Sequence, residues 1–416
     1  MTVFDEQTTT SVEFDHHSEE YAVNGAAINA ELRAKCPVAH TDAHGGFWVL
    51  SRYDDVVAAA KNDEAFASGH TVNGVSPLGV IIPPAPVPML PIEMDPPEYT
   101  PYRKLLNPLF SPAVSKTWAP RVTKWVDVCI DQVIEKGSFD LVDDLANPVP
   151  SLFTCEFLGL PVEDWYDYAD IQHKIIYTPP DEREPLLVRY METLGRVHSI
   201  IEETRKNPGE GLISDLVRAE IDGEPVATEM VLAMVNLVMA GGFDTTTAVT
   251  VNALIYLADN PVARQQLIDE PGMIPQACEE FLRYFTPQPA LARTLTKPVK
   301  VRDVELNTGD RVLLSWASAN RDETVFECPE EVVLDRFPNR HTTFGIGVHR
   351  CLGSHIARSE LIAMVTRVLA RMPDYRIDHD AATRYTSIGV INGWINAPAT
   401  FTPGKRLGDE PLPGAR

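Results

Sequence analysis

Cys351 stands in a short segment whose residue types and spacing could hold a metal. It follows Gly345 and Gly347, which let the backbone turn tightly because they carry no Cβ. Residues 354–365 come next, with apolar side chains at helical spacing. The free amides and the dipole at a helix start favour the thiolate form of a cysteine. Such a thiolate could bind a metal whose other ligands are not protein atoms, although a lone cysteine is more often an inert buried side chain.

A second group of chemically active residue types lies in the apolar run 230–257. The run contains Gly241, Gly242, Asp244 and three consecutive threonines. An interior glycine costs a helix about 1 kcal/mol relative to alanine, and a buried acid needs partners. Thr245 can bond the carbonyl of Gly241, four residues back, and open the helix locally. These features indicate a functional helix, although the run also fits a membrane span and the threonines also fit ordinary packing.

Glu280 and Arg283 are three residues apart and share a face of the next expected helix. On an exposed surface such a pair is common and contributes about 0.2–0.5 kcal/mol. Arg336 follows in Asp335-Arg336-Phe337, shortly before the cysteine segment.

These segments together carry a family resemblance. Phe344-Gly345-Ile346-Gly347-Val348-His349-Arg350-Cys351-Leu352-Gly353 resembles the haem-binding loop of the cytochrome P-450 superfamily, the haem-thiolate monooxygenases. Residues 241–246 resemble the family's oxygen-binding groove, and Glu280-Phe281-Leu282-Arg283 with Arg336 resembles its Glu-x-x-Arg network. The segments stand in the family's order, and the resemblance runs from about residue 47 to about residue 400. It implies that Cys351 is the axial iron ligand of a haem b.

The resemblance also implies roles for other residues. Asp244 and Thr245 would relay protons to dioxygen, and Glu280, Arg283 and Arg336 would form a structural network. The residues implied to contact the haem are Tyr99, Arg103, Gly241, Arg293, Phe344, Gly345, His349 and Gly353. Tyr99 occupies the family's usual histidine position, so this propionate contact would have no positive charge.

The segment from Gly69 to Leu90 is apolar, rich in proline and without charged side chains. Such a segment covers a ligand or is an irregular surface loop. The resemblance makes it part of the substrate pocket, whose expected lining residues are Val80, Ile81, Ile82, Val238, Ala290, Leu291, Val390 and Ile391. Because a charged ligand would be unpaired there, we expect an apolar substrate of terpenoid, aromatic or steroid-like type.

The elements that must position these residues are mostly helices. Periodicity predicts helices over 26–36, 54–61, 113–134, 151–174, 186–206 and 230–257, and strands over 47–51 and within 300–314. We therefore expect a mainly α chain with small peripheral β-sheets, of α+β class. The resemblance places the haem between the helix of Gly241 and the loop of Cys351.

Composition bounds the organisation and the setting of the chain. We find no linker or repeat in 416 residues, so we expect one domain over 21–403 between a flexible tail, 1–20, and a disordered one, 404–416. His16-His17 in the first tail reads as a solvated pair. The net charge of −23 argues against nucleic acid and anionic membranes. Six scattered cysteines and a polar start without a signal-peptide pattern predict a cytoplasmic protein with reduced thiols, and we expect a monomer.

The expected reaction is insertion of one atom of O2 into a C–H bond. Electrons would come from NAD(P)H through a separate ferredoxin and ferredoxin reductase, because no such module is fused. A haem sensor or carrier is the alternative, and a peroxygenase of this fold usually lacks the acid–alcohol pair. Residues 101–126 contain no acid but carry Arg103, Lys104, Lys116, Arg121 and Lys124. These charges could steer an acidic ferredoxin, or they are scattered solvated charges.

Overall fold

The computed structural model describes residues 10–69, 78–85, 87–179 and 182–414, which form two compact units. Unit 1 comprises Met1–Arg103, Glu279–Leu352 and Thr386–Asn392. Unit 2 comprises Lys104–Cys278, Gly353–Tyr385 and Gly393–Arg416. The chain passes between the units several times, and one haem domain over 21–403 stays a prediction.

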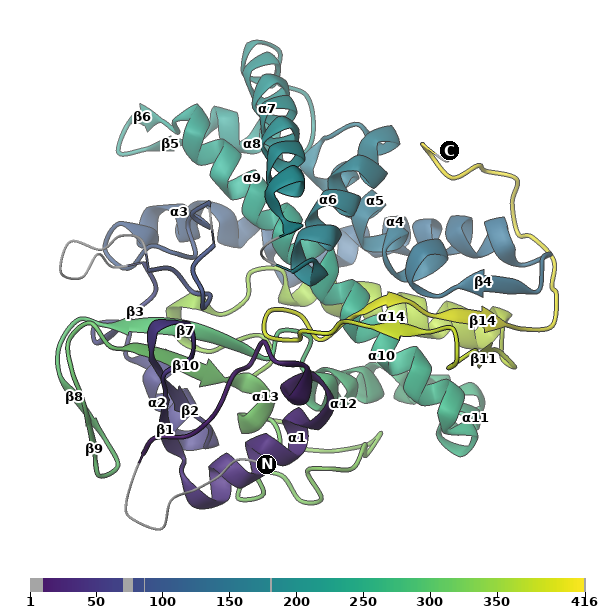
Figure 1. Cartoon of the computed structure of the whole chain (residues 1–416). Coiled ribbons are helices and arrows are strands. Elements are labelled where there is room, and N and C mark those ends of the chain that lie inside the picture. Colours follow the sequence, from purple (N-terminus) through teal and green to yellow (C-terminus); the bar gives the residue numbers. More distant parts are fainter. Residues whose placement is uncertain (1–9, 70–77, 86, 180–181, 415–416) are drawn as a thin grey trace. The chain divides into compact units, whose positions relative to one another are not determined.

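Unit 1 is built on a five-stranded sheet with the order β1-β2-β10-β7-β3 (Figure 1). The strands of unit 1 are β1 (Val38–Thr41), β2 (Phe47–Leu50), β3 (Phe66–Ala67), β7 (Ala290–Leu295), β10 (Arg311–Ser315) and a separate hairpin, β8 (Val299–Val301) with β9 (Val304–Leu306). Strand β10 pairs parallel to β2 and antiparallel to β7. Buried Leu50, Leu295, Leu314 and Trp316 form part of one apolar cluster beneath the sheet. This core holds β7, which carries Arg293, in place.

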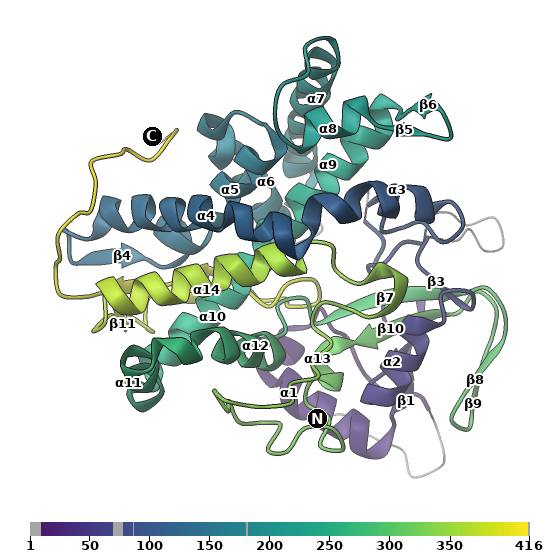
Figure 2. The ribbon, with the colours of Figure 1, turned by 180° about the vertical axis from the view of Figure 1, so that it is seen from behind.

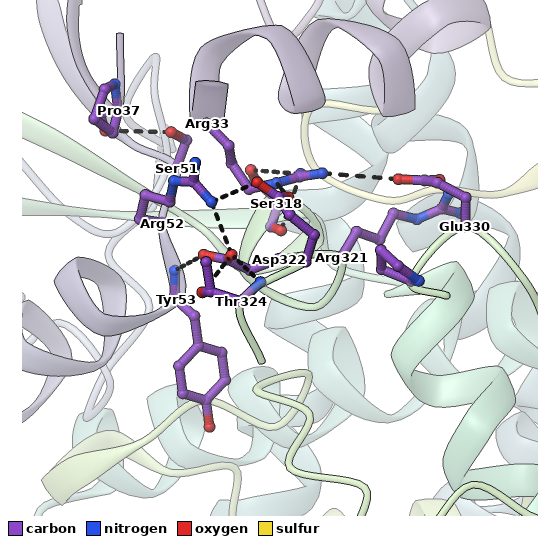
Figure 3. Close-up of polar contacts among 12 residues, drawn as sticks. Arg33, Pro37, Ser51, Arg52, Tyr53, Ser318, Arg321, Asp322, Thr324 and Glu330 are labelled. Atoms are coloured by element: carbon purple, nitrogen blue, oxygen red, sulfur yellow. Dashed lines mark hydrogen bonds and ion pairs between the residues drawn. The ribbon is translucent and has the colours of Figure 1, made fainter. Parts of the chain in front are cut away.

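Helices α2 (Tyr53–Lys61) and α13 (Trp316–Ala319) pack on this sheet, and α1 (Glu19–Lys35) packs on α13. Asp322, just after α13, accepts hydrogen bonds from the backbone N–H of Tyr53 at 2.9 Å and from Arg52 at 2.9 Å (Figure 3). Burial raises the pKa of Asp322, but these bonds and those from Thr324 outweigh it, so the pKa is lowered. The carboxylate thus caps α2 from another part of the chain, since Arg52 offers no side-chain cap.

The N-terminal segment 10–18 is packed against unit 1. Phe14 and His16 are buried, and His16 is only 2% exposed. The expectation that His16-His17 is a solvated pair is therefore wrong. Burial and the neighbouring histidines lower the pKa of His16 to about 3. The Phe14 ring stacks on the His16 ring and the Phe47 ring meets it edge to face, which composition alone could not indicate.

Unit 2 consists mainly of helices. They are α4 (Pro112–Val133), α5 (Pro148–Leu158), α6 (Trp165–Tyr177), α7 (Glu184–Lys206), α8 (Leu212–Arg218), α9 (Thr228–Gly242), α10 (Asp244–Asp259), α11 (Pro261–Asp269) and α14 (Ser354–Arg371). Helix α14 packs on α4 and α10, and α7 packs on α9 (Figure 2). Helices α3 (Tyr99–Leu106) and α12 (Ile274–Phe285) begin in one unit and end in the other.

The strands of unit 2 form small sheets. They are β4 (Ser138–Asp140), β11 (Arg376–Ile377) and β14 (Pro398–Thr400) in one sheet, with the pairs β5 (Glu220–Ile221) to β6 (Glu224–Pro225) and β12 (Thr383–Arg384) to β13 (Trp394–Asn396). Short helical turns in the two units are η1 (Ala43–Gly45), η2 (Asn107–Phe110), η3 (Val142–Ala146), η4 (Val162–Asp164), η6 (Pro271–Met273) and η7 (Gly347–His349). Residues 404–414, for which the sequence predicts disorder, include Leu407 and Gly408, whose amides donate to Asp131 of α4.

The expected fold class, mainly α with small β-sheets, is confirmed. Two long predicted helices are each divided in the structure. The helix expected over 151–174 is α5 and α6, because Gly159 adopts φ 83° as the left-handed cap of α5 and Pro161 follows. The helix expected over 230–257 is α9 and α10, divided at Phe243.

The run Thr228–Asp259 is long and apolar enough to cross a membrane by composition. It belongs instead to the packed interior of unit 2, where α9 contacts α5 and α7 and α10 contacts α14. Several polar side chains within it are hydrogen-bonded, including Thr245, Thr247 and Asn252.

Candidate functional site

The cysteine loop of unit 1 is a tight turn held by its own backbone. The Cys351 amide donates to the Phe344 carbonyl at 2.7 Å, and the Gly345 amide donates to the Thr342 carbonyl at 2.7 Å. Gly345 and Gly347 adopt φ 65° and 79°, which favour glycine. A Cβ on Gly347 would lie 2.4 Å from the Ala60 carbonyl oxygen. The loop leaves Cys351 exposed and outside any disulfide, three residues ahead of α14.

Two basic side chains of unit 1, Arg293 and His349, are buried and have few hydrogen-bond partners among the described residues. Arg293 on β7 is 4% exposed and donates to the carbonyl of its neighbour Ala292, with no ion pair among the described residues. Burial lowers its pKa to about 10. Both ring nitrogens of His349 are buried, and neither has a hydrogen-bond partner in the described parts of the chain. A buried guanidinium and an unsatisfied imidazole are unfavourable unless an anion binds them.

Tyr99 and Arg103, at the start of α3, join the cysteine loop. Arg103 donates to the Tyr99 hydroxyl at 3.2 Å and to the Arg350 carbonyl at 2.6 Å. The Tyr99 hydroxyl donates to the Val348 carbonyl at 3.2 Å, and its ring lies 4.5 Å from that of His349. In this structure Tyr99 therefore braces the loop through its hydroxyl.

Asp95 is a further residue of this cluster that the sequence did not single out. It accepts from the amides of Ser68 at 2.9 Å and Gly69 at 3.1 Å, and it lies 3.5 Å from His349 Nε2. Burial raises the pKa of Asp95, but His349 and these amides outweigh it, so the pKa is lowered. The cluster thus contains three basic side chains, Arg293, Arg103 and His349, but only one carboxylate. An additional anionic group could therefore bind there favourably.

In unit 2, the break between α9 and α10 has the predicted hydrogen bond. The Thr245 hydroxyl donates to the Gly241 carbonyl at 2.7 Å, which confirms the prediction from spacing. A Cβ built on Gly241 would meet no atom within 4 Å, so this helix face is open. On Gly242 a Cβ would lie 2.9 Å from the Thr154 hydroxyl, which explains the second glycine as a packing requirement.

Asp244 is paired with His173, which in turn contacts Tyr385, and the sequence analysis identified neither of these two residues. Its Oδ1 lies 2.7 Å from His173 Nδ1 on α6, and the Tyr385 hydroxyl lies 2.9 Å from the same nitrogen. Asp244 is 1% exposed. Burial lowers the pKa of His173, but the bond to Asp244 and its charge outweigh burial, so the pKa is raised. Burial raises the pKa of Tyr385, and the charge of Asp244 adds to that effect.

These contacts leave a proton donor and acceptor set inside unit 2. Asp244 Oδ2 and His173 Nε2 are buried and have no hydrogen-bond partner among the described residues. His173 bonds Oδ1 of Asp244, so Oδ2 stays available to a further hydrogen-bond partner. The arrangement suits a group that moves protons.

Glu280, Arg283 and Arg336 are brought together in unit 1. Arg283 donates to both carboxylate oxygens of Glu280 at 2.7 and 2.8 Å, and both residues are fully buried. Arg336 donates to the same oxygens at 3.1 and 3.0 Å. Backbone carbonyls accept the remaining Arg283 donors, including those of Asn320 and Pro329. Their assignment to a structural network stays a prediction, which the geometry supports.

The residues predicted to line the substrate pocket fall in both units. Val80, Ile81, Ile82, Ala290, Leu291, Val390 and Ile391 belong to unit 1, and Val238 belongs to α9 in unit 2. The Val80 carbonyl accepts from the Ala292 amide at 2.7 Å, which joins this segment to β7. Residues 70–77 and 86 of the segment from 69 to 90 lie outside the described residues.

Residues 78–85 contain no charged side chain, yet charged side chains from other segments hold their backbone in place. Arg311 donates to the carbonyls of Gly79 at 2.7 Å and Ile81 at 3.0 Å, and Glu93 accepts from the Val80 amide at 3.0 Å. Burial lowers the pKa of Arg311 to about 10. Arg311 and Glu93 thus bond backbone groups of this segment. The sequence of residues 78–85 itself does not indicate these contacts.

Glu360 on α14 is a buried acid of unit 2 with one weak partner. Its Oε2 lies 3.5 Å from the Thr246 hydroxyl, and its Oε1 has no partner among the described residues. Burial raises the pKa of Glu360 to about 8. The folded protein therefore keeps this carboxyl protonated at neutral pH, whereas the unfolded chain does not.

We expect wild-type protein to lose stability relative to Glu360→Gln as the pH rises from about 5 to about 8. Below the unfolded pKa of about 4.3 both states hold the proton. Above it only the folded state does, so unfolding releases a proton and becomes more favourable by up to about 1.4 kcal/mol per pH unit. Urea unfolding at several pH values checks this, with the exposed Glu224→Gln as the control. A difference between wild type and Glu360→Gln that does not change with pH would contradict it.

A cytochrome P450 family model matches residues 165–373 of this chain. The chain is 32% identical over 82% of its length to a putative cytochrome P450, YjiB, of Bacillus subtilis, and this match covers 86% of that relative. It is 30% identical over 95% of its length to a steroid C26-monooxygenase of Mycolicibacterium smegmatis, covering 98% of that protein.

Solved structures agree with these matches. The structure of CYP109E1 from Bacillus megaterium in complex with testosterone aligns with a TM-score of 0.83 at 28% identity, covering 92% of this chain and 99% of that one. The fold and the relatives define the class as that of the cytochromes P450. The chain belongs to the cytochrome P450 family and is a P450 monooxygenase.

Proposed function

We propose that this chain binds haem b through Cys351 and inserts one atom of O2 into an apolar organic molecule. Electrons would come from NAD(P)H through a separate ferredoxin and ferredoxin reductase. When bound, the haem supplies the iron at which dioxygen is activated. The chain's own residues bind the haem and deliver protons.

The observation that carries the haem assignment is the buried Arg293 guanidinium and the His349 imidazole beside the cysteine loop. Arg293 is buried without an ion pair among the described residues, and both ring nitrogens of His349 lack a hydrogen-bond partner there, although Asp95 lies 3.5 Å from Nε2. Arg103 on α3 donates to the Arg350 carbonyl of the cysteine loop. The two haem propionates are anions that would satisfy these groups. Phe344, Gly345 and Gly353 would frame the loop around Cys351, and the open face at Gly241 leaves a flat group free of side-chain clashes.

Proton delivery is proposed for Asp244 and Thr245. The support is the buried pairing of Asp244 with His173 at 2.7 Å and the partly exposed Thr245 hydroxyl one residue away. A carboxyl whose charge is compensated on one oxygen can pass a proton from the other. A haem sensor or carrier would need neither group.

The proposed substrate is an apolar molecule of terpenoid, aromatic or steroid-like type. The proposed lining residues of unit 1 are apolar, and the charged groups near them, Arg311 and Glu93, are occupied by backbone bonds. A steroid-like molecule is favoured because one relative is a steroid C26-monooxygenase and one solved neighbour holds testosterone. We also propose a cytoplasmic monomer, and the absence of disulfides among the six cysteines supports a reducing compartment.

The experiment that tests the reaction uses ¹⁸O2. Purified holoprotein is supplied with a ferredoxin, its reductase, NADPH and a neutral steroid, terpenoid or aromatic compound. The masses of the products are then measured by mass spectrometry. We expect one ¹⁸O atom per product molecule. A sensor or carrier would bind haem and compounds but release no labelled product.

A further prediction concerns the ferredoxin. Lys104 and Lys116 are exposed and have no ion pair among the described residues, whereas Arg121 pairs with Glu156 at 3.1 Å and Lys124 with Glu410 at 2.7 Å. The attraction for an acidic partner thus rests on the two unpaired lysines of this segment. Changing both to glutamate should slow ferredoxin-supported turnover and flatten its dependence on salt, because steering is screened over about 10 Å at 0.1 M salt.

Stopped-flow reduction at several ionic strengths measures this effect. The matched control changes Lys206 and Lys300, exposed lysines outside the segment, to glutamate. If both double variants behave alike, residues 101–126 do not receive the ferredoxin.

A further inference from the structure

Asp15, His16 and His44 of unit 1 form a cluster that the proposed reaction does not use. One potential ligand atom from each residue lies within 4.8 Å of the other two. His44 Nε2 and Asp15 Oδ1 are 2.8 Å apart. The rings of His16 and His44 meet edge to face, with centroids 5.7 Å apart. Two imidazoles and one carboxylate therefore converge on one point.

His16 is oriented as a ligand would be. Its Nε2 lies 3.0 Å from the Ile82 carbonyl oxygen, which can only accept, so Nε2 carries the proton and Nδ1 keeps a lone pair. Nδ1 is buried and has no hydrogen-bond partner in the part of the chain that the structure describes. Leaving a buried acceptor unsatisfied is unfavourable. A ring whose N–H is fixed on a carbonyl while its other nitrogen is available is the usual state of a metal-binding histidine.

We propose that Asp15, His16 and His44 bind one divalent transition-metal ion, with Zn²⁺ as the best fit. Two imidazole nitrogens and one carboxylate oxygen suit Zn²⁺, which takes four ligands, and water would be the fourth. Mg²⁺ and Ca²⁺ fit less well because they prefer oxygen ligands. Ligand atoms around tetrahedral Zn²⁺ lie about 3.3 Å apart, given Zn–N bonds of about 2.0–2.1 Å. The partly exposed Asp15 and His44 side chains can rotate to close that distance.

Bound metal would connect three segments of unit 1. The Ile82 carbonyl receives both His16 Nε2 at 3.0 Å and His17 Nε2 at 2.7 Å. His17 Nδ1 lies 2.9 Å from the Ser387 hydroxyl. The ion would fix the N-terminal segment to His44, and the hydrogen bonds of His16 and His17 continue from there to residues 80–82 and 386–392. Residues 80–82 and 386–392 both contain proposed pocket residues, so metal binding could change the affinity for substrate. That effect rests on the proposed function, whereas metal binding itself does not.

The test measures metal binding on full-length holoprotein without a polyhistidine tag. Protein freed of metal by chelator treatment is dialysed against micromolar Zn²⁺, and the metal retained is counted by elemental analysis. We expect one Zn²⁺ per chain beyond the haem iron, and a higher thermal midpoint in its presence. Zinc-edge X-ray absorption should show nitrogen and oxygen neighbours including two histidines.

Three variants and one control separate this site from incidental binding. His16→Gln, Asp15→Asn and His44→Asn should each weaken Zn²⁺ binding at least tenfold. Asp15→Asn keeps the carbonyl that accepts from the His17 amide, and asparagine tolerates the φ of 51° at His44, so these two variants should fold even if His16→Gln does not. His379→Gln, an exposed histidine paired with Asp259, should bind as wild type does.

The possible outcomes decide the proposal. No retained Zn²⁺ in the wild type would overturn it and leave the cluster as an Asp–His hydrogen bond beside a carbonyl. Equal affinity in Asp15→Asn, His44→Asn and wild type would overturn it as well. Loss of binding in Asp15→Asn and His44→Asn, with His379→Gln unchanged, would support it.

Discussion

Replacing Glu280 by alanine should lower the free energy of unfolding by about 3–5 kcal/mol, the range for breaking a buried ion pair from one side. The carboxylate has no exposed surface and accepts from Arg283, Arg336, the Asn339 amide and the Val333 backbone N–H. Its removal leaves the buried Arg283 guanidinium without its counter-charge. A loss of this size is a large part of the stability of an ordinary domain.

Chemical denaturation measures this effect, and two further variants interpret it. Glu305→Ala, on the exposed side of β9, should change stability by less than about 0.5 kcal/mol. Glu280→Gln keeps the volume and one acceptor but removes the charge. Its loss of unfolding free energy should therefore lie between those of Glu280→Ala and Glu305→Ala. If Glu280→Ala is as stable as Glu305→Ala, the three residues do not form the network described.

Replacing Asp244 by asparagine should lower the rate of product formation by about 10²–10⁴-fold, the usual contribution of a positioned acid or base. Asparagine keeps the shape and can still bond His173, but it cannot carry a proton on Oδ2. Because Asp244 is 1% exposed, bulk water does not replace it directly. Substrate binding should change little, since the proposed role is proton delivery.

Thr245→Ala should affect coupling more than binding. Without the hydroxyl that now bonds the Gly241 carbonyl, reducing equivalents should be diverted to hydrogen peroxide. Product formed per NAD(P)H consumed gives the measurement, and Thr245→Ser, which keeps a hydroxyl, is the matched control. Unchanged coupling in Thr245→Ala would remove this side chain from the proposed mechanism.

The parts of the site that the sequence predicted are those carried by local segments. Residues 344–353 predicted a tight glycine turn ahead of a helix, and the spacing of Thr245 predicted its bond to Gly241. Both follow from contacts within a few residues, where backbone geometry decides the outcome. The fold class followed from helical periodicity in the same way.

The contacts that the sequence did not predict join distant positions. His173 meets Asp244 across 71 residues, and Tyr385 meets His173 across 212 residues. Neither His173 nor Tyr385 stands in a recognisable motif. Asp95 shortly precedes α3 in sequence, whereas in the structure its carboxylate lies 3.5 Å from His349 Nε2. His16 was expected to be solvated because Asp15, His17 and Ser18 beside it in sequence are polar. In the structure its ring packs against Phe14 and against Phe47, 31 residues away in sequence. Pairing between elements depends on tertiary packing, which periodicity does not encode.

The central claim is that Cys351 binds the haem iron as a thiolate. The spectrum of the reduced carbon-monoxide complex tests it most directly, because the Soret band shifts strongly to the red only when the ligand opposite carbon monoxide is a thiolate. We predict this red-shifted band for the wild type and for Cys328→Ser, which changes the other exposed cysteine. Cys351→His should bind haem without it. A red-shifted band that persists in Cys351→His would contradict the account.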